Sequence, residues 1–252
     1  AGVLIALIGI GQAFLVTAVG FALSAELLGT LGLEPLVRRS DEHDGGMWEG
    51  VRYIFGNRLF LGTIGLSFFT SVFGMSYQTL LPIFAEDVLE IGSQGFGFLH
   101  TAAGVGGFLG TLAMIKIGGG RHAGPIMMLS AACFGFFVAG FAGSRDPRLS
   151  LALLFCAGFS SSMYLNIGMT TLQLLVPDEL RGRVMGVWSM TWFLAAVGGL
   201  PASVLAEWIG APLTVALGAL SVGGFALLLF ATSGELRQLP TAEAHPQRSV
   251  SA

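Results

Sequence analysis

Four polar side chains recur along one long apolar segment of the sequence. They are separated by four, four and three residues, which places all four on one face of a helix. Hydroxyl and amide groups in an apolar environment face either a water-filled cavity, where they can bind a ligand, or a neighbouring helix. A hydrogen bond between membrane helices contributes only about 0.6 kcal/mol on average, and the two interpretations stay equally open. The residues are Ser162, Asn166, Thr170 and Gln173.

Two ionisable residues, Glu26 and His100, also lie within apolar runs. A histidine titrates near neutral pH and can carry a proton, and a carboxylate that faces a cavity can bind a proton or a cationic ligand. Both residues are therefore candidates for proton or ion coupling. Each lies near one end of its run, so an interfacial position explains it at least as well.

Charged residues gather in the segment VPDELRGRVMGV, residues 176–187. Arg181 and Arg183 can pair with Asp178 and Glu179, or with carbonyl groups at the end of a helix. The proline in the segment suits the first turn of a short helix. We predict that this cytoplasmic loop acts as a clamp that holds one conformational state and releases it in another. The alternative is that the basic residues simply remain on the cytoplasmic side.

Small and aromatic residues also recur at helical spacing. Gly106 and Gly110 form a G-x-x-x-G pair, which favours close packing of two helices and leaves a hinge as the alternative. Trp188 and Trp192 lie one turn apart and could stack on a ligand, although packing against lipid or protein is the favoured interpretation.

The motifs of several enzyme classes are absent. The sequence has no G-x-x-x-x-G-K loop, no H-E-x-x-H pair and no serine nucleophile elbow. Its two cysteines, Cys133 and Cys156, lie in apolar runs and have no metal-ligand spacing. No basic patch indicates nucleic-acid binding. We therefore expect no enzymatic activity, no cofactor and no metal.

The composition indicates a membrane protein. Hydrophobic residues make up 54% of the chain and charged residues only 11%, whereas ordinary soluble domains carry roughly 25% charged residues. Glycine is abundant, with 38 residues, and glycine within apolar runs lets membrane helices approach closely. The expected fold class is an all-α protein with several membrane spans.

A spanning helix needs about 20 apolar residues, and the sequence contains seven stretches of about this length. The run at residues 1–8 is too short and is expected to be the end of an earlier helix. The first residue is Ala and no signal peptide precedes it, so we expect the chain to begin partway through a larger protein. The seven predicted spans are 12–33, 59–85, 95–115, 123–143, 149–176, 184–206 and 211–233.

Basic residues predict the orientation of these spans. If the loops alternate sides, ten of the twelve lysine and arginine residues fall on one side, and only Arg145 and Arg148 fall on the other. Basic loops stay in the cytoplasm. The segment at 34–58 and the C-terminal tail should therefore be cytoplasmic, in a multi-pass protein of the plasma membrane.

Two regions should lie outside the bilayer. In the linker at 34–58, Trp48, Val51 and Ile54 or Phe55 recur at helical spacing and predict a short interfacial helix. The tail is rich in Pro, Ser, Gln and Ala and is expected to be disordered. The predicted domains are the end of one helical bundle at 1–33, the linker at 34–58, a six-helix bundle at 59–234 and the tail at 235–252.

One helix, a long linker, six helices and a tail form a layout that resembles the second half of a major facilitator superfamily transporter, preceded by the last helix of its first half. The segment at 176–187 resembles the cytoplasmic loop between helices ten and eleven of the drug and siderophore exporters in that superfamily. Two other runs, LLPIFAEDVL at 80–89 and GFGFLHTAAGVGGFLGTL at 95–112, resemble their helices seven and eight. The loop KIGGGRHAG at 116–124 lacks the acidic residue of the superfamily's full loop signature.

This resemblance implies a secondary active transporter that moves a small molecule by alternating access, in the direction of efflux. The polar face of residues 162–173 would then line a central cavity near the middle of the membrane. Membrane lipid and the missing N-terminal half of the same protein are the implied partners, beside the small-molecule substrate. The alternative is a membrane subunit that does not itself transport, such as a scaffold or the membrane part of an ATP-driven exporter.

Overall fold

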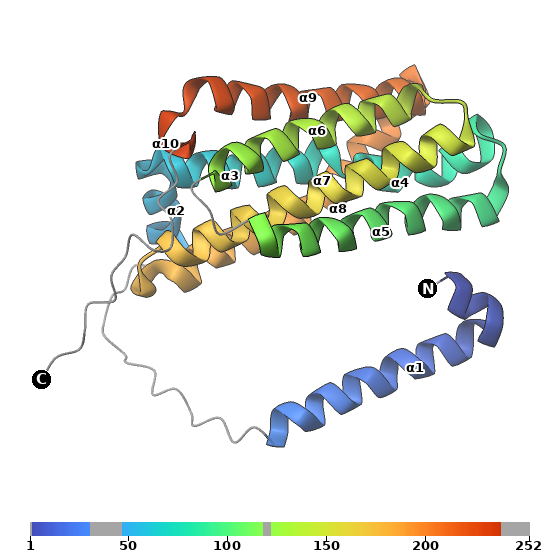
Figure 1. Cartoon of the computed structure of the whole chain (residues 1–252), viewed down its shortest axis with the longest axis horizontal. Helices are drawn as coiled ribbons and strands as arrows, with labels where there is room; N and C mark the ends of the chain where they lie inside the picture. Colours follow the sequence, from blue (N-terminus) through green and yellow to red (C-terminus); the bar gives the residue numbers. More distant parts are fainter. Residues whose placement is uncertain (1, 31–46, 118–121, 238–252) are drawn as a thin grey trace, which may run out of the picture. The chain divides into compact units, whose positions relative to one another are not determined.

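A computed structural model describes residues 2–30, 47–117 and 122–237 of the chain, and all regular structure in these ranges is helical (Figure 1). Two compact units are present, residues 1–44 and residues 45–252, and each is described by itself. The first unit contains one helix, α1 (Gly2–Thr30). The second contains α2 (Met47–Gly56), α3 (Arg58–Phe69), η1 (Thr70–Gly74), α4 (Ser76–Ile83), η2 (Phe84–Val88), α5 (Gly92–Ile117), α6 (Ala123–Gly143), α7 (Pro147–Leu175), α8 (Asp178–Ile209), α9 (Ala211–Thr232) and α10 (Gly234–Arg237).

The six spans predicted after the linker are confirmed. The described residues contain six helices long and apolar enough to cross a membrane. The first of them, Arg58–Val88, is assembled from α3, η1, α4 and η2, and the other five are α5 to α9. In the position of the remaining predicted span, residues 12–33, α1 contains a shorter apolar stretch, Phe14–Thr30. The sequence predicts two elements within residues 1–33, whereas the structure has the single helix α1 there.

Local sequence explains where several spans begin and end. Asn57 precedes α3, and its side chain accepts a hydrogen bond from the Leu59 backbone N–H at 3.0 Å. Asp146 does the same for α7, where Oδ1 accepts from the Arg148 N–H at 2.7 Å and proline occupies the first turn. Gly210, with φ +87°, lies between α8 and α9. This left-handed conformation is strained for other residues, so glycine permits the turn there.

The first span departs from a regular α-helix in two places. The π-helical segments η1 and η2 flank α4, which contains Pro82. A π-turn inserts an extra residue into a helical turn, and such segments are frequent at functional sites. The sequence predicts one uninterrupted helix at 59–85, since nothing in the apolar pattern marks these insertions.

Small residues allow the most extensive contacts in the bundle, between α5 and α7. A side chain at Gly106 would overlap the carbonyl oxygen of Phe155, and one at Gly110 would overlap that of Phe159. On the other helix, Gly158 lies in the same way against Ala103. The close packing predicted for the G-x-x-x-G pair is thereby confirmed.

At one end of the bundle, α2 packs on α3 and α8 (Figure 1). The sequence predicts a short interfacial helix in the linker, and the structure has a helix there, α2, with Trp48 and Phe55 exposed; its interfacial position stays a prediction. Its other face is buried: Ile54 joins an apolar cluster with α3, α7 and α8, and Gly50 lies directly against Arg183. Thus α2 is part of the six-span unit. The rest of the linker, with Arg38 and Arg39, and the tail from 238 lie outside the described residues.

Candidate functional site

The spans α5 and α8 are the least buried of the six. Large apolar side chains on both are exposed, among them Phe98 and Phe108 on α5 and Phe193 and Leu200 on α8. Polar side chains lie beside these apolar surfaces, in two neighbouring pockets. The uncovered faces of α5 and α8 are therefore the part of the bundle where polar chemistry is accessible.

The first pocket, of about 550 Å³, lies between α7 and α8. Polar groups enter it from both helices, with Ser162 and Asn166 on α7 and Ser189 on α8. Trp188 and Trp192 complete the wall on the side of α8. Trp188 is buried in the apolar cluster beneath α2, whereas Trp192 is exposed. Trp188 therefore has the packing role favoured from the sequence, and both indole rings also line the pocket.

The second pocket, of about 410 Å³, lies among α4, α5 and α7. Ser162 lines both pockets, so together they form one continuous surface, which we call the polar groove. The polar residues that line the second pocket are Tyr77, Gln78, His100, Thr111, Ser161 and Ser162.

Asn166 links α7 to α5, two of the helices that border the groove. Its side-chain nitrogen donates to the backbone carbonyl of Ser162 at 2.8 Å and to the hydroxyl oxygen of Thr111 at 3.4 Å. The Thr111 hydroxyl in turn donates to the Gly107 carbonyl at 3.1 Å. These bonds fix the amide plane at the groove wall. Its carbonyl oxygen has no hydrogen-bond partner among the described residues and can accept one from a ligand or water.

The structure brings together two of the four residues in the predicted polar stripe. Ser162 and Asn166 line the groove, whereas Thr170 and Gln173 line none of its wall. Thr170 is half-buried and Gln173 is exposed one to two turns further along α7. Helical spacing gives the face of a helix but not how far along that face a cavity extends. The role predicted for Thr170 and Gln173 therefore stays a prediction.

The groove also contains polar residues that the stripe does not reveal, chiefly Gln78, Thr111 and Ser189. Each is a polar residue inside an apolar span, on a helix other than α7. An amide within a membrane span is costly unless it faces protein or water. Gln78, in the run SYQTLL, therefore carries a sequence signal that would have added it to the candidates.

The two residues predicted for ion coupling are placed differently. His100 lines the second pocket and is exposed there, with its ring edge-on to Phe96 at a centroid distance of 4.8 Å. Glu26 lies on α1, in the other unit, and its predicted role stays a prediction. No group of three or more metal-ligating side chains is found among the described residues.

The predicted cytoplasmic loop is helical. Residues 178–183 form the first turns of α8, which begins after Pro177 and continues to Ile209, and the short separate helix predicted there is therefore wrong. Acidic residues in a first turn favour helix initiation, and Asp178 and Glu179 occupy that position.

The charged residues of this turn make two ion pairs. Arg181 pairs with Asp178 at 2.6 Å on the surface, as predicted. Arg183 pairs with Glu49 of α2, a partner that lies far away in the sequence and that spacing could not reveal. Glu179 is exposed. The turn is thus tied to the linker helix.

Comparison with known proteins gives the chain's relationships. The family profile described as Major Facilitator Superfamily matches residues 1–200. The enterobactin exporter EntS of Shigella dysenteriae serotype 1 (strain Sd197) is 26% identical over 238 residues, which is 90% of this chain and 54% of that protein. The enterobactin exporter EntS of Escherichia coli O81 (strain ED1a) matches with the same identity and coverage. The chain thus spans about half the length of these relatives. No solved structure matches it.

Proposed function

Because this chain belongs to the Major Facilitator Superfamily, we propose that it acts within a secondary active transporter that exports a small molecule by alternating access. The observation that carries the proposal is the polar groove on the uncovered side of α5, α7 and α8. The relatives are named as exporters, which supports the outward direction. A further set of helices, covering the same side, would supply the opposite wall of the groove.

The cost of burying polar groups supports a wet groove. An amide that faces lipid without a partner loses several kcal/mol. Gln78 and the free carbonyl of Asn166 therefore require water, protein or a ligand opposite them. Carriers of this kind bind substrate near the middle of the membrane, and Asn166 lies well inside α7, which runs from Pro147 to Leu175.

The residues of the groove indicate the class of substrate. Its wall combines neutral hydrogen-bonding groups with aromatic rings, and it contains one histidine, His100. A small amphipathic molecule, with aromatic or apolar parts and several hydrogen-bonding groups, suits such a wall. Enterobactin, the compound in the relatives' names, is the first candidate to test.

The ion pairs at the start of α8 support a clamp. Arg183 holds α2 against α8, and Arg181 reinforces the first turn through Asp178. Charged contacts that exist in one conformational state and break in the other are one way in which such transitions are controlled. We include both pairs in the proposal as contacts of this kind.

Transport by the full-length protein tests the proposal. Ser162→Ala and Asn166→Ala remove hydrogen-bonding groups from the groove, and Ser221→Ala is the matched control. Ser221 lies on α9, half-buried, and its hydroxyl donates to the Gly218 carbonyl within its own helix. The groove variants should change which compounds of a panel are exported, at normal expression, whereas the control should not. Unchanged selectivity in both groove variants would contradict a substrate site at this wall.

A further inference from the structure

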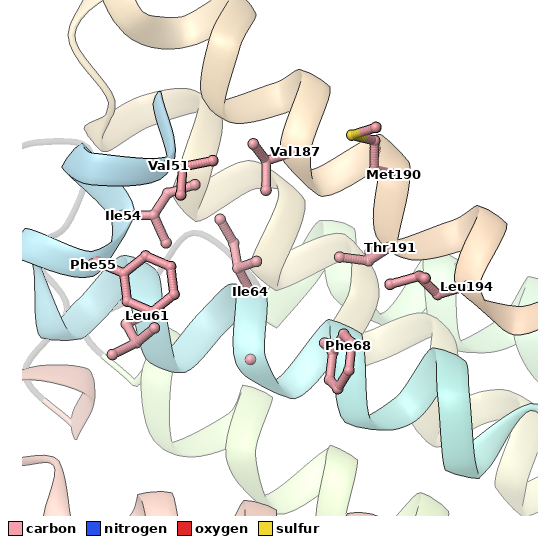
Figure 2. A pocket seen from close by; sticks show the side chains of 11 residues that line it. Val51, Ile54, Phe55, Leu61, Ile64, Phe68, Val187, Met190, Thr191 and Leu194 are labelled. Carbon is pink, nitrogen blue, oxygen red and sulfur yellow. The ribbon is translucent and has the colours of Figure 1, made fainter. Parts of the chain in front are cut away.

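A second, chemically different pocket lies at the end of the bundle where α2 meets α3 and α8 (Figure 2). Its volume is about 290 Å³, and eleven residues line it. Figure 2 shows the apolar side chains that line it from all three helices, with Ile54 of α2, Ile64 of α3 and Val187 of α8 pointing toward one another. It shares no lining residue with the polar groove.

The pocket offers no free hydrogen-bonding group. Thr191 is the one lining residue with a polar side chain, and its hydroxyl is engaged with the Trp188 carbonyl at 2.7 Å and the Ser67 hydroxyl at 2.8 Å. A polar ligand would lose its hydrogen bonds to water without replacement. A hydrocarbon chain has no hydrogen bonds to water to lose, and its transfer from water into an apolar pocket is favourable.

Two arginines lie beside the pocket. Arg52 and Arg58 are exposed, and neither has an ion-pair partner among the described residues. Arg52 follows Val51 and lies one turn before Phe55 on α2, and Arg58 lies one turn before Leu61 on α3, so both are surface neighbours of lining residues. The nearby carboxylate of α2 is already used by Arg183. The two guanidinium groups therefore remain available to an anion.

The position of the two arginines at the start of a predicted membrane span favours a lipid phosphate as the anion. Arg58 is the first residue of the span that ends at Val88, and the pocket residues of α3 follow within the next three turns. On α2, Met47 and Trp48 are exposed, as expected of a helix in the headgroup region of a bilayer. We therefore expect the arginines to lie at headgroup depth and the pocket to begin at acyl-chain depth.

We propose that this pocket binds one acyl chain of an anionic phospholipid, whose phosphate is held by Arg52 and Arg58. A guanidinium group binds phosphate oxygens through two parallel hydrogen bonds. A zwitterionic lipid brings an ammonium group toward two positive charges and binds more weakly. A lipid held in this way joins α2 to α3, on the side of α2 opposite its ion pair with α8. The proposal does not depend on what the protein transports.

Photolabelling of the full-length protein in detergent tests this proposal. The probe is phosphatidylglycerol with a diazirine at the end of one acyl chain, and labelled peptides are mapped by mass spectrometry. We expect labelling to concentrate in residues 51–68 and 187–194. Unlabelled phosphatidylglycerol should compete at about thirtyfold lower concentration than phosphatidylethanolamine, given the attraction of about 1 kcal/mol for each of the two arginines near an anionic lipid.

Variants separate the headgroup from the pocket. Arg52→Gln combined with Arg58→Gln should weaken labelling about thirtyfold, whereas Arg148→Gln, at an exposed arginine in the first turn of α7, should leave it unchanged. Val187→Trp fills the pocket and should reduce labelling with both arginines present. Labelling spread evenly over all spans, equal competition by the two lipids, or no labelling because another segment of the full protein fills the pocket would each overturn the proposal.

Discussion

Asn166 is the residue on which the proposed substrate path depends most. Its nitrogen is held by the Ser162 carbonyl and the Thr111 hydroxyl, so the amide has a fixed orientation across the α5–α7 contact. Asn166 lines a pocket together with two indole rings, those of Trp188 and Trp192. A side chain that only linked the two helices would not need a cavity beside it, and this geometry favours a role in binding.

Water should therefore reach position 166. In a full-length protein without Cys133 and Cys156, Asn166→Cys should react with a water-soluble thiol reagent in at least one transport state. Phe136→Cys is the control, since Phe136 is exposed on α6 and lines none of the pockets described above. We expect it to face lipid and to react far more slowly. No reaction at 166 in any state would make Asn166 a packing residue.

The sequence predicts part of this site because a helix has a fixed period. Ser162 and Asn166 follow from spacing on α7 alone. Thr111 and Ser189 do not, since they come from α5 and α8, and only the folded bundle shows which faces of these helices meet α7. Glu49 is missed for a similar reason. Its partner Arg183 lies on another helix, far away in the sequence, and the spacing of charges within one segment cannot reveal such a pair.

The two ion pairs of α8 should differ in strength. The side chains of Arg183 and Glu49 are 27% and 38% exposed, whereas those of Arg181 and Asp178 are 45% and 84% exposed. Exposed pairs contribute little, typically 0.2–1 kcal/mol. We expect Glu49→Gln and Arg183→Gln to show a coupling free energy of about 1 kcal/mol or more in a double-mutant cycle, measured by unfolding of the purified full-length protein.

The surface pair serves as the control for this cycle. Asp178→Asn and Arg181→Gln should give a coupling close to zero at physiological salt. If the pair between α2 and α8 shows no larger coupling than the surface pair, it does not hold the linker helix. Slower transport in the Arg183→Gln variant at normal expression would add evidence for the clamp.

At the scale of helices, the contact between α5 and α7 rests on glycines that admit no side chain. Gly106→Ala should destabilise the protein by about 1–3 kcal/mol, because the new methyl group would overlap the Phe155 carbonyl and the two backbones must separate. Thermal unfolding of the full-length protein in detergent measures the change.

Gly97→Ala is the matched control on the same helix, since its Cβ would meet no atom within 4 Å. There the substitution should be neutral or slightly stabilising, because alanine is the better helix former. If both variants behave alike, close packing does not explain the glycines of α5 and the alternative of a hinge gains weight.

The sequence predicts the helices better than their irregularities. Charged and polar residues interrupt the apolar runs near the helix ends, so five of the six spans both begin and end within three residues of the prediction, and the exception is α8, which begins earlier than predicted. The π-helical segments of the first span have no comparable signal, because they depend on how η1 packs against α8 and α9. The docking of α2 was missed because its buried face contains glycine, which adds nothing to an apolar pattern.

The orientation of these helices in the membrane is a separate prediction. The basic residues predict that the linker and the tail lie in the cytoplasm. In intact cells, a membrane-impermeant thiol reagent should label Asp146→Cys, before α7, and should not label Asp44→Cys, in the linker. Labelling at 44 without labelling at 146 would reverse the orientation.

For the molecule as a whole, the six-span unit has the size and helix count expected of one half of a transporter in its family. This chain covers 54% of the length of its relatives, and the groove opens on a side that α5 and α8 leave uncovered. We therefore propose that the groove becomes a closed path only when a second bundle faces it, and that residues 45–252 alone do not transport.

Flux through the full-length protein in proteoliposomes tests this account most directly. Enterobactin and a panel of amphipathic compounds are loaded, a proton gradient is imposed, and ATP is left out. We predict that at least one compound crosses the membrane when the proton gradient is imposed and that a protonophore abolishes this movement. Asn166→Ala should reduce the movement or change which compound moves. Movement that requires ATP hydrolysis by a partner, or no movement of any compound under any imposed ion gradient, would contradict the account.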